Sequence, residues 1–288
     1  GLSALIAPLV VSQQLIRLDV PLMIAVSVLA LVLGLDGVFD RTDGLLLFTG
    51  LVGYIGFLIY HSRKESAEVK NECAREFGQR ANDANEPGQA PSAGSVWAIN
   101  IGFVIGGLVL LVLGSRWLVE SAVTFAQYLG VSQLVIGLTI VAAGTSLPEL
   151  VTSIIASIRG ERDIAVGNVV GSNLFNIMGV LGLSSMVAPA GVGVSTAVIG
   201  FDLPIMIVVA FACLPIFFTG GVISRFEGAL LLGYYLAYTL YLVLATSHHD
   251  ALPMFSAVML YFAIPLTLGT LILISVRALR KTSRIDNA

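Results

Sequence analysis

The sequence predicts an all-α polytopic membrane protein, and three observations support this fold class. Hydrophobic residues make up 57% of the chain and charged residues 11%, with a mean hydropathy of +0.93, whereas soluble domains carry about 25% charged residues. Several apolar runs reach the roughly 20 residues that a membrane-spanning helix needs. The sequence lacks the period-two alternation of a membrane β-barrel, and helices are the other way to satisfy backbone groups in lipid.

Eight apolar runs are long enough to span a bilayer, and residues 1–12 resemble part of a ninth. The eight runs are 19–36, 43–60, 97–127, 132–157, 163–188, 198–219, 226–246 and 253–276. No basic patch interleaved with aromatic residues is visible in the sequence, so we expect no nucleic-acid partner. The lipid bilayer is the expected surroundings.

Three pairs of matching segments indicate an internal duplication. The pairs are GLSALIAP (1–8) with GLSSMVAP (182–189), DVPLMI (19–24) with DLPIMI (202–207), and RTDGLLL (41–47) with RFEGALL (225–231). The second unit begins near Asn100, so residues 100–181 have no counterpart before Gly1. We therefore expect an inverted-repeat fold that is N-terminally truncated in this sequence, with a second polar motif further upstream. The alternative is a partial duplication.

The charge pattern predicts the orientation of the chain in the membrane. Residues 61–96 are the only long polar stretch and carry five basic residues, which predicts a cytoplasmic linker in the plasma (inner) membrane. Counting spans from this linker puts further basic loops and the basic C-terminus in the cytoplasm, and loops without Lys or Arg outside. Matching segments then lie in opposite orientations, as in many secondary transporters. The expected domains are 1–60, the linker 61–96, the second half 97–246, and an additional helix at 253–276.

GTSLPE, at 144–149, places a single carboxylate in an apolar run. In a helix, Thr145, Ser146 and Glu149 project toward one side, while Pro148 cannot donate a hydrogen bond to the carbonyl of Gly144. A carboxylate within a membrane costs about 2.5 to 3.5 kcal/mol on insertion scales, and such residues mark ion pathways. The motif predicts a cation site.

The next span carries a second polar cluster, GNVVGSNLFN, at 167–176. Ser172 and Asn176 are one α-helical turn apart, and Gly167 with Gly171 predicts a close helix approach that brings these oxygen atoms near Glu149. Neither motif contains His or Cys, and an all-oxygen site suits a hard cation such as Ca²⁺.

Less specific interpretations apply to the other polar residues. Thr139, Thr152 and Ser153 are expected to hydrogen-bond neighbouring helices, whereas Asn168 and Asn173 either brace the broken helices or contact the ion. The glycines between 102 and 115 predict a sliding surface or ordinary helix packing, and the loop at 248–250 (His-His-Asp) is expected to be solvated. An intramembrane hydrolase is disfavoured, because Glu149 has no histidine near it in the sequence.

GTSLPE followed by GNVVGSNLFN, in adjacent spans of an inverted duplication, resembles the alpha-repeat (132–188) of the cation/Ca²⁺ antiporter superfamily. The resemblance implies an antiporter with ten core helices that exchanges Ca²⁺ for Na⁺; the alternatives are an H⁺/Ca²⁺ or K⁺-dependent exchanger, or a cation channel. It implies no cofactor, because the ions are cargo. The implied ligands are Glu149, Thr145, Ser146, Ser172, Asn176 and the carbonyl of Ala142, completed by a second alpha-repeat. Asn176 is an aspartate in some members, which leaves the stoichiometry open, and the helix at 253–276 lies beyond the ten-helix core.

Overall fold

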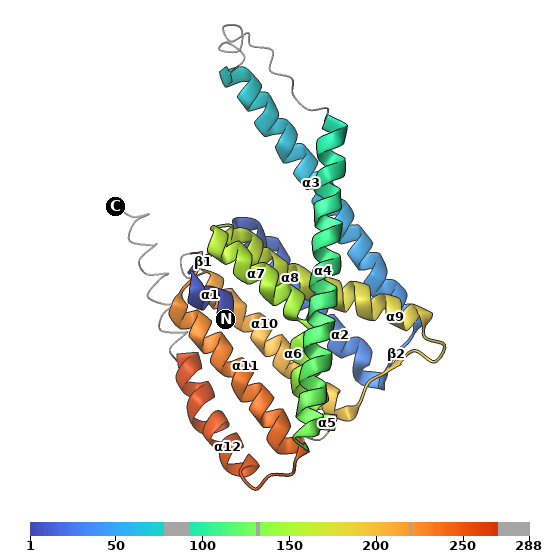
Figure 1. Cartoon of the computed structure of the whole chain (residues 1–288), viewed down its shortest axis with the longest axis vertical. Helices are drawn as coiled ribbons and strands as arrows, with labels where there is room; N and C mark the ends of the chain where they lie inside the picture. The colour runs from blue at the N-terminus through green and yellow to red at the C-terminus, as the bar shows by residue number, and fades with distance from the viewer. Residues whose placement is uncertain (78–92, 131–132, 219–220, 270–288) are drawn as a thin grey trace. The chain divides into compact units, whose positions relative to one another are not determined.

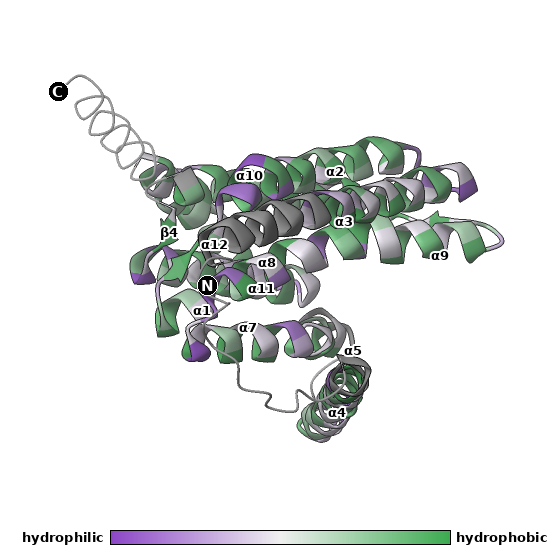
Figure 2. Ribbon diagram, turned by 90° about the horizontal axis from the view of Figure 1, so that it is seen from above, coloured by the Kyte–Doolittle hydropathy of each residue, from purple (hydrophilic) through white to green (hydrophobic). Residues whose placement is uncertain are grey.

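The computed structural model describes residues 1–77, 93–130, 133–218 and 221–269 (Figure 1). Within these ranges seven helices are long and apolar enough to cross a bilayer: Leu15–Asp36, Arg41–Ser62, Ile99–Tyr128, Arg162–Val187, Val198–Phe217, Arg225–Thr246 and Leu252–Gly269. A bent pair, Thr139–Thr145 with Leu147–Arg159, has the composition of an eighth span. Each predicted run therefore corresponds to one of these spans, and the all-α fold class of a multi-pass membrane protein is confirmed. Apolar residues dominate the helices (Figure 2).

The regular elements fall into three sets. In chain order, the α-helices are α1 (Leu2–Ile6), α2 (Val20–Leu33), α3 (Arg41–Phe77), α4 (Ala93–Tyr128), α5 (Gln133–Ile136), α6 (Ala142–Thr145), α7 (Leu147–Arg159), α8 (Arg162–Leu174), α9 (Gly182–Val187), α10 (Leu203–Phe218), α11 (Arg225–Thr246) and α12 (Leu252–Val258). The π-helical segments are η1 (Leu15–Asp19), η3 (Gly137–Val141), η4 (Phe175–Leu181), η5 (Val198–Asp202) and η6 (Met259–Ala263), and η2 (Gly34–Asp36) is a 3₁₀-helix. Two-residue strands are β1 (Leu9–Val10), β2 (Val38–Phe39), β3 (Val192–Gly193) and β4 (Val222–Ile223).

The described helices form two compact units. The first unit comprises 1–38, 111–176 and the described part of 193–288, and the second comprises 177–192 with the described part of 39–110. In the first unit α2 packs on α10, α7 on α8, and α11 on α12. In the second unit α3 packs on α9.

A close glycine contact joins α1 to α11 in the first unit. A Cβ atom on Gly228 would lie 2.9 Å from the carbonyl oxygen of Gly1, and a Cβ on Gly1 would lie 2.9 Å from the backbone nitrogen of Leu232. Real Cβ atoms do not approach backbone atoms this closely. Only glycine therefore fits at the crossing, which is extended by the antiparallel pairing of β1 with β4.

The second unit contains the equivalent contact between α3 and α9. A Cβ on Gly44 would lie 2.6 Å from the carbonyl oxygen of Gly182, and a Cβ on Gly182 would lie 3.0 Å from the nitrogen of Phe48. The sequence repeat maps Gly182 onto Gly1 and Gly44 onto Gly228. In each unit, a short helix from one copy of the repeat thus packs on a long helix from the other copy.

Both copies begin this long helix with a reciprocal cap. The Ser224 hydroxyl accepts a hydrogen bond from the backbone N–H of Glu227, whose carboxylate accepts one from the backbone N–H of Ser224. At the equivalent start of α3, Asp40 Oδ1 accepts hydrogen bonds from the backbone N–H groups of Thr42 and Asp43, and Asp43 Oδ2 accepts one from the Asp40 N–H. Reciprocal caps of this type satisfy N–H groups that the helix itself leaves unpaired. Helix α3 continues through residues 61–77 of the predicted linker, and residues 78–92 of that linker lie outside the described part of the chain.

Candidate functional site

The GTSLPE segment breaks a span into two helices. The axes before and after the break differ by 53°, and the backbone of Ser146 between them has φ −94° and ψ 5°. Pro148 occupies the first turn of α7, where its missing N–H costs no helical hydrogen bond. The break is therefore built from the local sequence, and it exposes backbone groups beside the first turn of α7.

Glu149 lies in this first turn of α7. A negative charge at a helix N-terminus is favoured by the helix dipole. Its Oε2 atom is buried, yet it has no hydrogen-bond partner among the described residues. Leaving a buried charged acceptor unsatisfied costs more than about 1 to 3 kcal/mol, so this atom is a strong candidate for contact with a cation.

The predicted ligands before the break lie together on α6 and at its end. The Thr145 hydroxyl donates a hydrogen bond to the carbonyl of Ala142, with 3.0 Å between the oxygen atoms. The side chains of Thr145 and Ser146 are both exposed. The three residues thus present hydroxyl and carbonyl oxygens, and each of these oxygens retains a lone pair for a cation.

The predicted ligands on the next span are arranged differently from the sequence-based expectation. The Ser172 hydroxyl donates to the carbonyl of Val169 at 3.0 Å, near the end of α8. Asn176 is exposed and lies in the π-helical segment η4, which follows α8 directly. The α-helical spacing that aligns Ser172 with Asn176 therefore does not continue through Asn176, because the turn widens there.

Asn168 joins α8 to α7. Its side-chain Nδ2 donates to the backbone carbonyl of Glu149 at 3.1 Å and to the hydroxyl of Ser153 at 3.0 Å. Ser153 is 2% exposed, and its hydroxyl lies 3.4 Å from the carbonyl of Ala165 on α8. Of the two roles open for Asn168, the observed contacts are those of a brace between the helices.

The remaining polar residues have structural contacts. The hydroxyls of Thr139 and Thr152 donate to carbonyls one turn earlier in their own helices, at 2.7 and 2.8 Å. Asn173 Nδ2 lies 3.6 Å from the sulfur of Met23 on α2. For Thr139 and Thr152 the bonds stay within one helix, whereas the sequence-based expectation was a bond to a neighbouring helix.

The expectation that Gly167 and Gly171 allow a close helix approach is wrong for the described residues. A Cβ atom on either glycine would meet no described heavy atom within 4 Å. The contact between α7 and α8 instead includes the buried small residues Ser153 and Ala165. The close approach at this site is made by Gly144, because a Cβ there would overlap the Val119 side chain on α4.

A polar contact that the sequence did not lead us to expect lies on the first unit's η5. The Tyr238 hydroxyl donates to Asp202 Oδ1 at 2.6 Å, and the ring of Phe201 stacks on Tyr238 and Tyr241. Asp202 is the only acidic residue in its apolar run, as Glu149 is in the preceding motif. That isolation is the signal in the sequence that could have indicated a partly buried polar contact.

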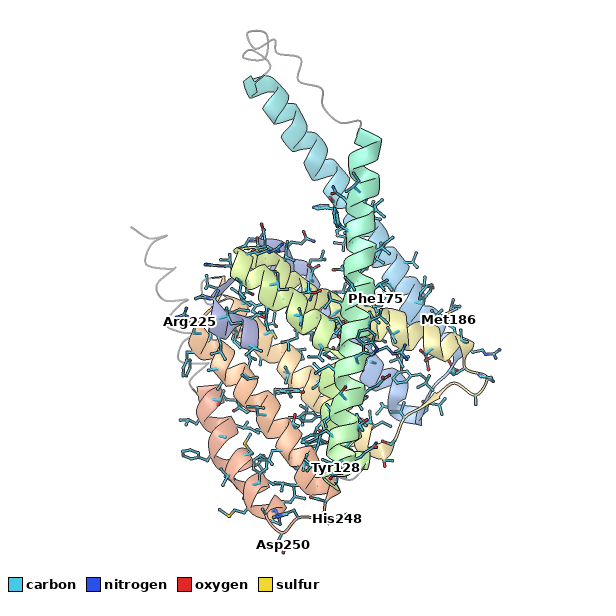
Figure 3. The ribbon with its side chains drawn as sticks, in the orientation of Figure 1. Tyr128, Phe175, Met186, Arg225, His248 and Asp250 are labelled. Atoms are coloured by element: carbon cyan, nitrogen blue, oxygen red, sulfur yellow. The ribbon has the colours of Figure 1, made fainter. Side chains whose placement is uncertain are left out.

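Within the described ranges, no three His, Cys, Asp or Glu side chains lie close enough to hold a metal ion. Residues 248–250 occupy the exposed turn between α11 and α12 (Figure 3). The polar groups around the broken span are instead hydroxyls, carbonyls, an amide and one carboxylate, which is a donor set for hard cations.

Comparison with known proteins gives consistent matches. Residues 99–244 match the family model of the sodium/calcium exchanger protein. The chain is 36% identical to the putative antiporter CaxA of Alkalimonas amylolytica over 83% of this chain and 71% of the relative. It is 42% identical to the sodium/calcium exchanger MaX1 of Methanosarcina acetivorans over 44% of this chain and 36% of the relative. The solved structure of the sodium/calcium exchanger from Methanococcus jannaschii matches with a TM-score of 0.58 and 29% identity, covering 82% of this chain and 68% of that structure.

Proposed function

Because the chain belongs to the sodium/calcium exchanger family of the cation/Ca²⁺ antiporter superfamily, whose members are transporters and not enzymes, we propose that it exchanges Ca²⁺ for Na⁺ across a membrane by alternating access. The observation that carries this proposal is the buried Oε2 of Glu149, which has no hydrogen-bond partner among the described residues. It lies beside a helix break lined by hydroxyl and carbonyl oxygens. A cation supplies the missing partner.

The proposed ion ligands are Glu149 with Thr145, Ser146, Ser172, Asn176 and the carbonyl of Ala142. Residues 1–288 contain one GTSLPE motif. A second alpha-repeat, from a preceding segment or another polypeptide, supplies a second carboxylate in this proposal. Two carboxylates balance the charge of one Ca²⁺ or of two Na⁺, so either ion load leaves the site neutral.

Charge balance also gives a reason for coupling. An empty site retains uncompensated carboxylates within the membrane, which is energetically costly. The change between outward-open and inward-open states is then favoured when the site is occupied, because the ion shifts the equilibrium by its differential affinity for the states. Val119 on α4 contacts the helix break at Gly144. A movement of α4 would therefore displace backbone atoms directly beside the proposed ligands.

The counter-ion and the orientation complete the proposal. Na⁺ is the proposed counter-ion, and H⁺ or K⁺ coupling is the alternative. The proposed location is the plasma (inner) membrane, with the linker 61–96 and the C-terminus in the cytoplasm. Arg225 lies at one end of α11 and the turn with His248 and Asp250 follows its other end (Figure 3), which agrees with assigning these two loops to opposite sides.

Replacing the carboxylate of Glu149 tests the proposal. Glu149→Gln keeps the side-chain shape but removes the charge that compensates the cation. We expect radiolabelled Ca²⁺ uptake into proteoliposomes under a Na⁺ gradient to fall by at least about 30-fold, since about 2 kcal/mol or more of ion stabilisation is lost. Thermal stability without Ca²⁺ should be retained, because the native carboxylate oxygen has no partner to lose among the described residues.

The control is Glu161→Gln, which removes one carboxylate from the exposed segment between α7 and α8. It should transport at the wild-type rate. Imposing a H⁺ or K⁺ gradient instead of the Na⁺ gradient identifies the counter-ion. Normal Ca²⁺ exchange by Glu149→Gln would remove the residue on which the proposal depends, and uptake by residues 1–288 alone would exclude the need for a second alpha-repeat.

A further inference from the structure

Asn168 makes an unusual contact for a side chain so close to the proposed ion site. Its amide nitrogen donates to the backbone carbonyl of Glu149 at 3.1 Å and to the hydroxyl of Ser153 at 3.0 Å. Both hydrogen atoms of Nδ2 are therefore used. The carbonyl can only accept, so the amide nitrogen, and not its oxygen, must face Glu149.

Ser153, which lies on α7, makes a second contact with α8. Its hydroxyl lies 3.4 Å from the carbonyl of Ala165, three residues before Asn168. Ser153 is 2% exposed, and Ala165 is 1% exposed. The bonds therefore lie in a water-poor contact, where a hydrogen bond is electrostatically stronger than in water.

The first turn of α7 lacks a side-chain cap, although the helix also packs on α1. Ser146 precedes the helix but makes no side-chain cap, and Pro148 lacks an N–H. The axis has just bent by 53°. The bond from Asn168 thus reaches the backbone of the carboxylate-bearing residue from the neighbouring helix, one turn before Ser172.

We propose that Asn168 is a positioning residue that holds Glu149 at the height where its carboxylate and the oxygen of Ser172 meet the same cation. This inference rests on the proposed cation-exchange function. Asn168 does not touch the ion in this arrangement; it acts through the backbone of Glu149. Loss of the bond leaves every ion ligand present but allows the α7 turn to shift relative to α8.

Steady-state exchange by the full-length protein tests this role. Asn168→Ala removes both bonds, and we expect the Ca²⁺ concentration for half-maximal exchange to rise by about tenfold, the effect of losing one to two hydrogen bonds. The maximal rate at saturating Ca²⁺ should stay close to that of wild type. A general loss of folded protein would lower the maximal rate without changing half-saturation.

Two further variants make the test specific. Ser153→Ala removes one arm of the contact and should raise the half-saturating Ca²⁺ concentration by a smaller factor, and combining it with Asn168→Ala should add nothing. Asn173→Ala is the matched control, because the Asn173 amide contacts the sulfur of Met23 on α2 and not α7. It should leave half-saturation unchanged.

Ca²⁺-dependent thermal stabilisation gives a readout besides transport. Ligand binding raises the melting temperature according to the ratio of ligand concentration to Kd, so Asn168→Ala should need about tenfold more Ca²⁺ for the same shift. Unchanged half-saturation and an unchanged thermal shift in both Asn168→Ala and Ser153→Ala would overturn the positioning role. Full transport by Glu149→Gln would instead overturn the ion site itself, so the two failures are distinguishable.

Discussion

Glycines serve opposite purposes at the helix crossings and on α8. Gly44 and Gly182 lie where α3 meets α9, and a Cβ on Gly44 would lie only 2.6 Å from a backbone oxygen. Gly167 and Gly171 lie on α8 beside the proposed ligands, and a Cβ there would meet no described atom within 4 Å. The crossings therefore need glycine for packing. On α8 the absence of a side chain leaves space beside the polar residues.

The difference teaches that a small-xxx-small pattern does not by itself locate a helix contact. At the crossings, backbone approach excludes any side chain, and no proposed ion ligand takes part. Around the broken span, small residues coincide with hydroxyls, an amide and a carboxylate oxygen that has no hydrogen-bond partner among the described residues. One region holds the fold together, and the other carries groups that cost stability.

Adding one methyl group at each kind of glycine should give the largest contrast. Gly44→Ala forces a Cβ against the backbone of α9, and overpacking of this kind costs about 1–3 kcal/mol. We expect a clearly lower melting temperature of the detergent-solubilised protein. Gly171→Ala should leave the melting temperature unchanged or slightly higher, because alanine favours a helix over glycine.

Gly53→Ala is the control within α3, since a Cβ on Gly53 would meet no described atom within 4 Å. It should melt like wild type or slightly above it. Equal melting temperatures for Gly44→Ala and Gly53→Ala would contradict the tight crossing. A large loss in Gly171→Ala would show that α8 is packed more closely there than the described residues indicate.

Adding a carboxylate beside the broken span should change the pH dependence of Ca²⁺ transport. Asn176→Asp adds a second carboxylate to the proposed ion site, where repulsion between like charges favours proton binding. Protons should then compete better with Ca²⁺, so transport should be inhibited at a higher pH than in wild type. The pH profile of Ca²⁺ uptake measures this shift.

Asn173→Asp is the matched control for Asn176→Asp. It adds the same charge on the same span, but at an amide that contacts Met23, and should change the pH profile less. A changed dependence on membrane potential in Asn176→Asp would indicate that an extra cation is bound instead of a proton. Wild-type pH and voltage profiles would place Asn176 outside the ion site.

The smallest expected effect is a difference in pH dependence between the caps at the starts of α3 and α11. Hydrogen bonds from the Thr42 hydroxyl and then from the Asp43 N–H hold the pKa of the exposed Asp40 carboxyl below its usual value. A depressed pKa in the folded state contributes stability above the unfolded pKa, about 3.9, and this contribution is lost as the pH falls through the folded value. Ser224, at the equivalent position on α11, does not titrate.

Asp40→Asn keeps an acceptor for the cap but removes the titration. The melting temperature of wild type should therefore fall slightly more steeply than that of Asp40→Asn below about pH 4. Thermal melting across about pH 3 to 6 measures the difference. Parallel curves would mean that ionisation of Asp40 does not contribute to the stability of α3.

The spans could be predicted from sequence, because span prediction depends only on length and apolar content. All eight runs correspond to helical spans, including the bent one at 139–159. The π-helical segments could not be predicted, since a widened turn depends on packing around it. The repeat could be predicted from its matching sequence segments. The packing of the short helix of one copy on the long helix of the other could not, because it depends on contacts such as that of Gly44 with Gly182.

The features of the site that depend on neighbouring residues in the sequence could be predicted. Pro148 and Gly144 indicated a break, and isolation in an apolar run singled out Glu149. The partner of the Glu149 backbone was not predictable, because an asparagine on a polar helix face serves equally well as a ligand or a brace. Asn168 acts as a brace only because Ser153 and the Glu149 carbonyl lie opposite it, which is a property of two packed helices.

The two π-helical turns η1 and η5 lie at matching places in the two copies, each ending in an aspartate two residues before a proline. A widened turn shared by both copies is most simply explained by one event before the gene duplicated. The single-unit ancestor then had the same short and long helices. Its glycine crossings, which now join one copy to the other, would have joined two separate polypeptides. The fused chain thus retains, as internal packing, what began as a subunit interface.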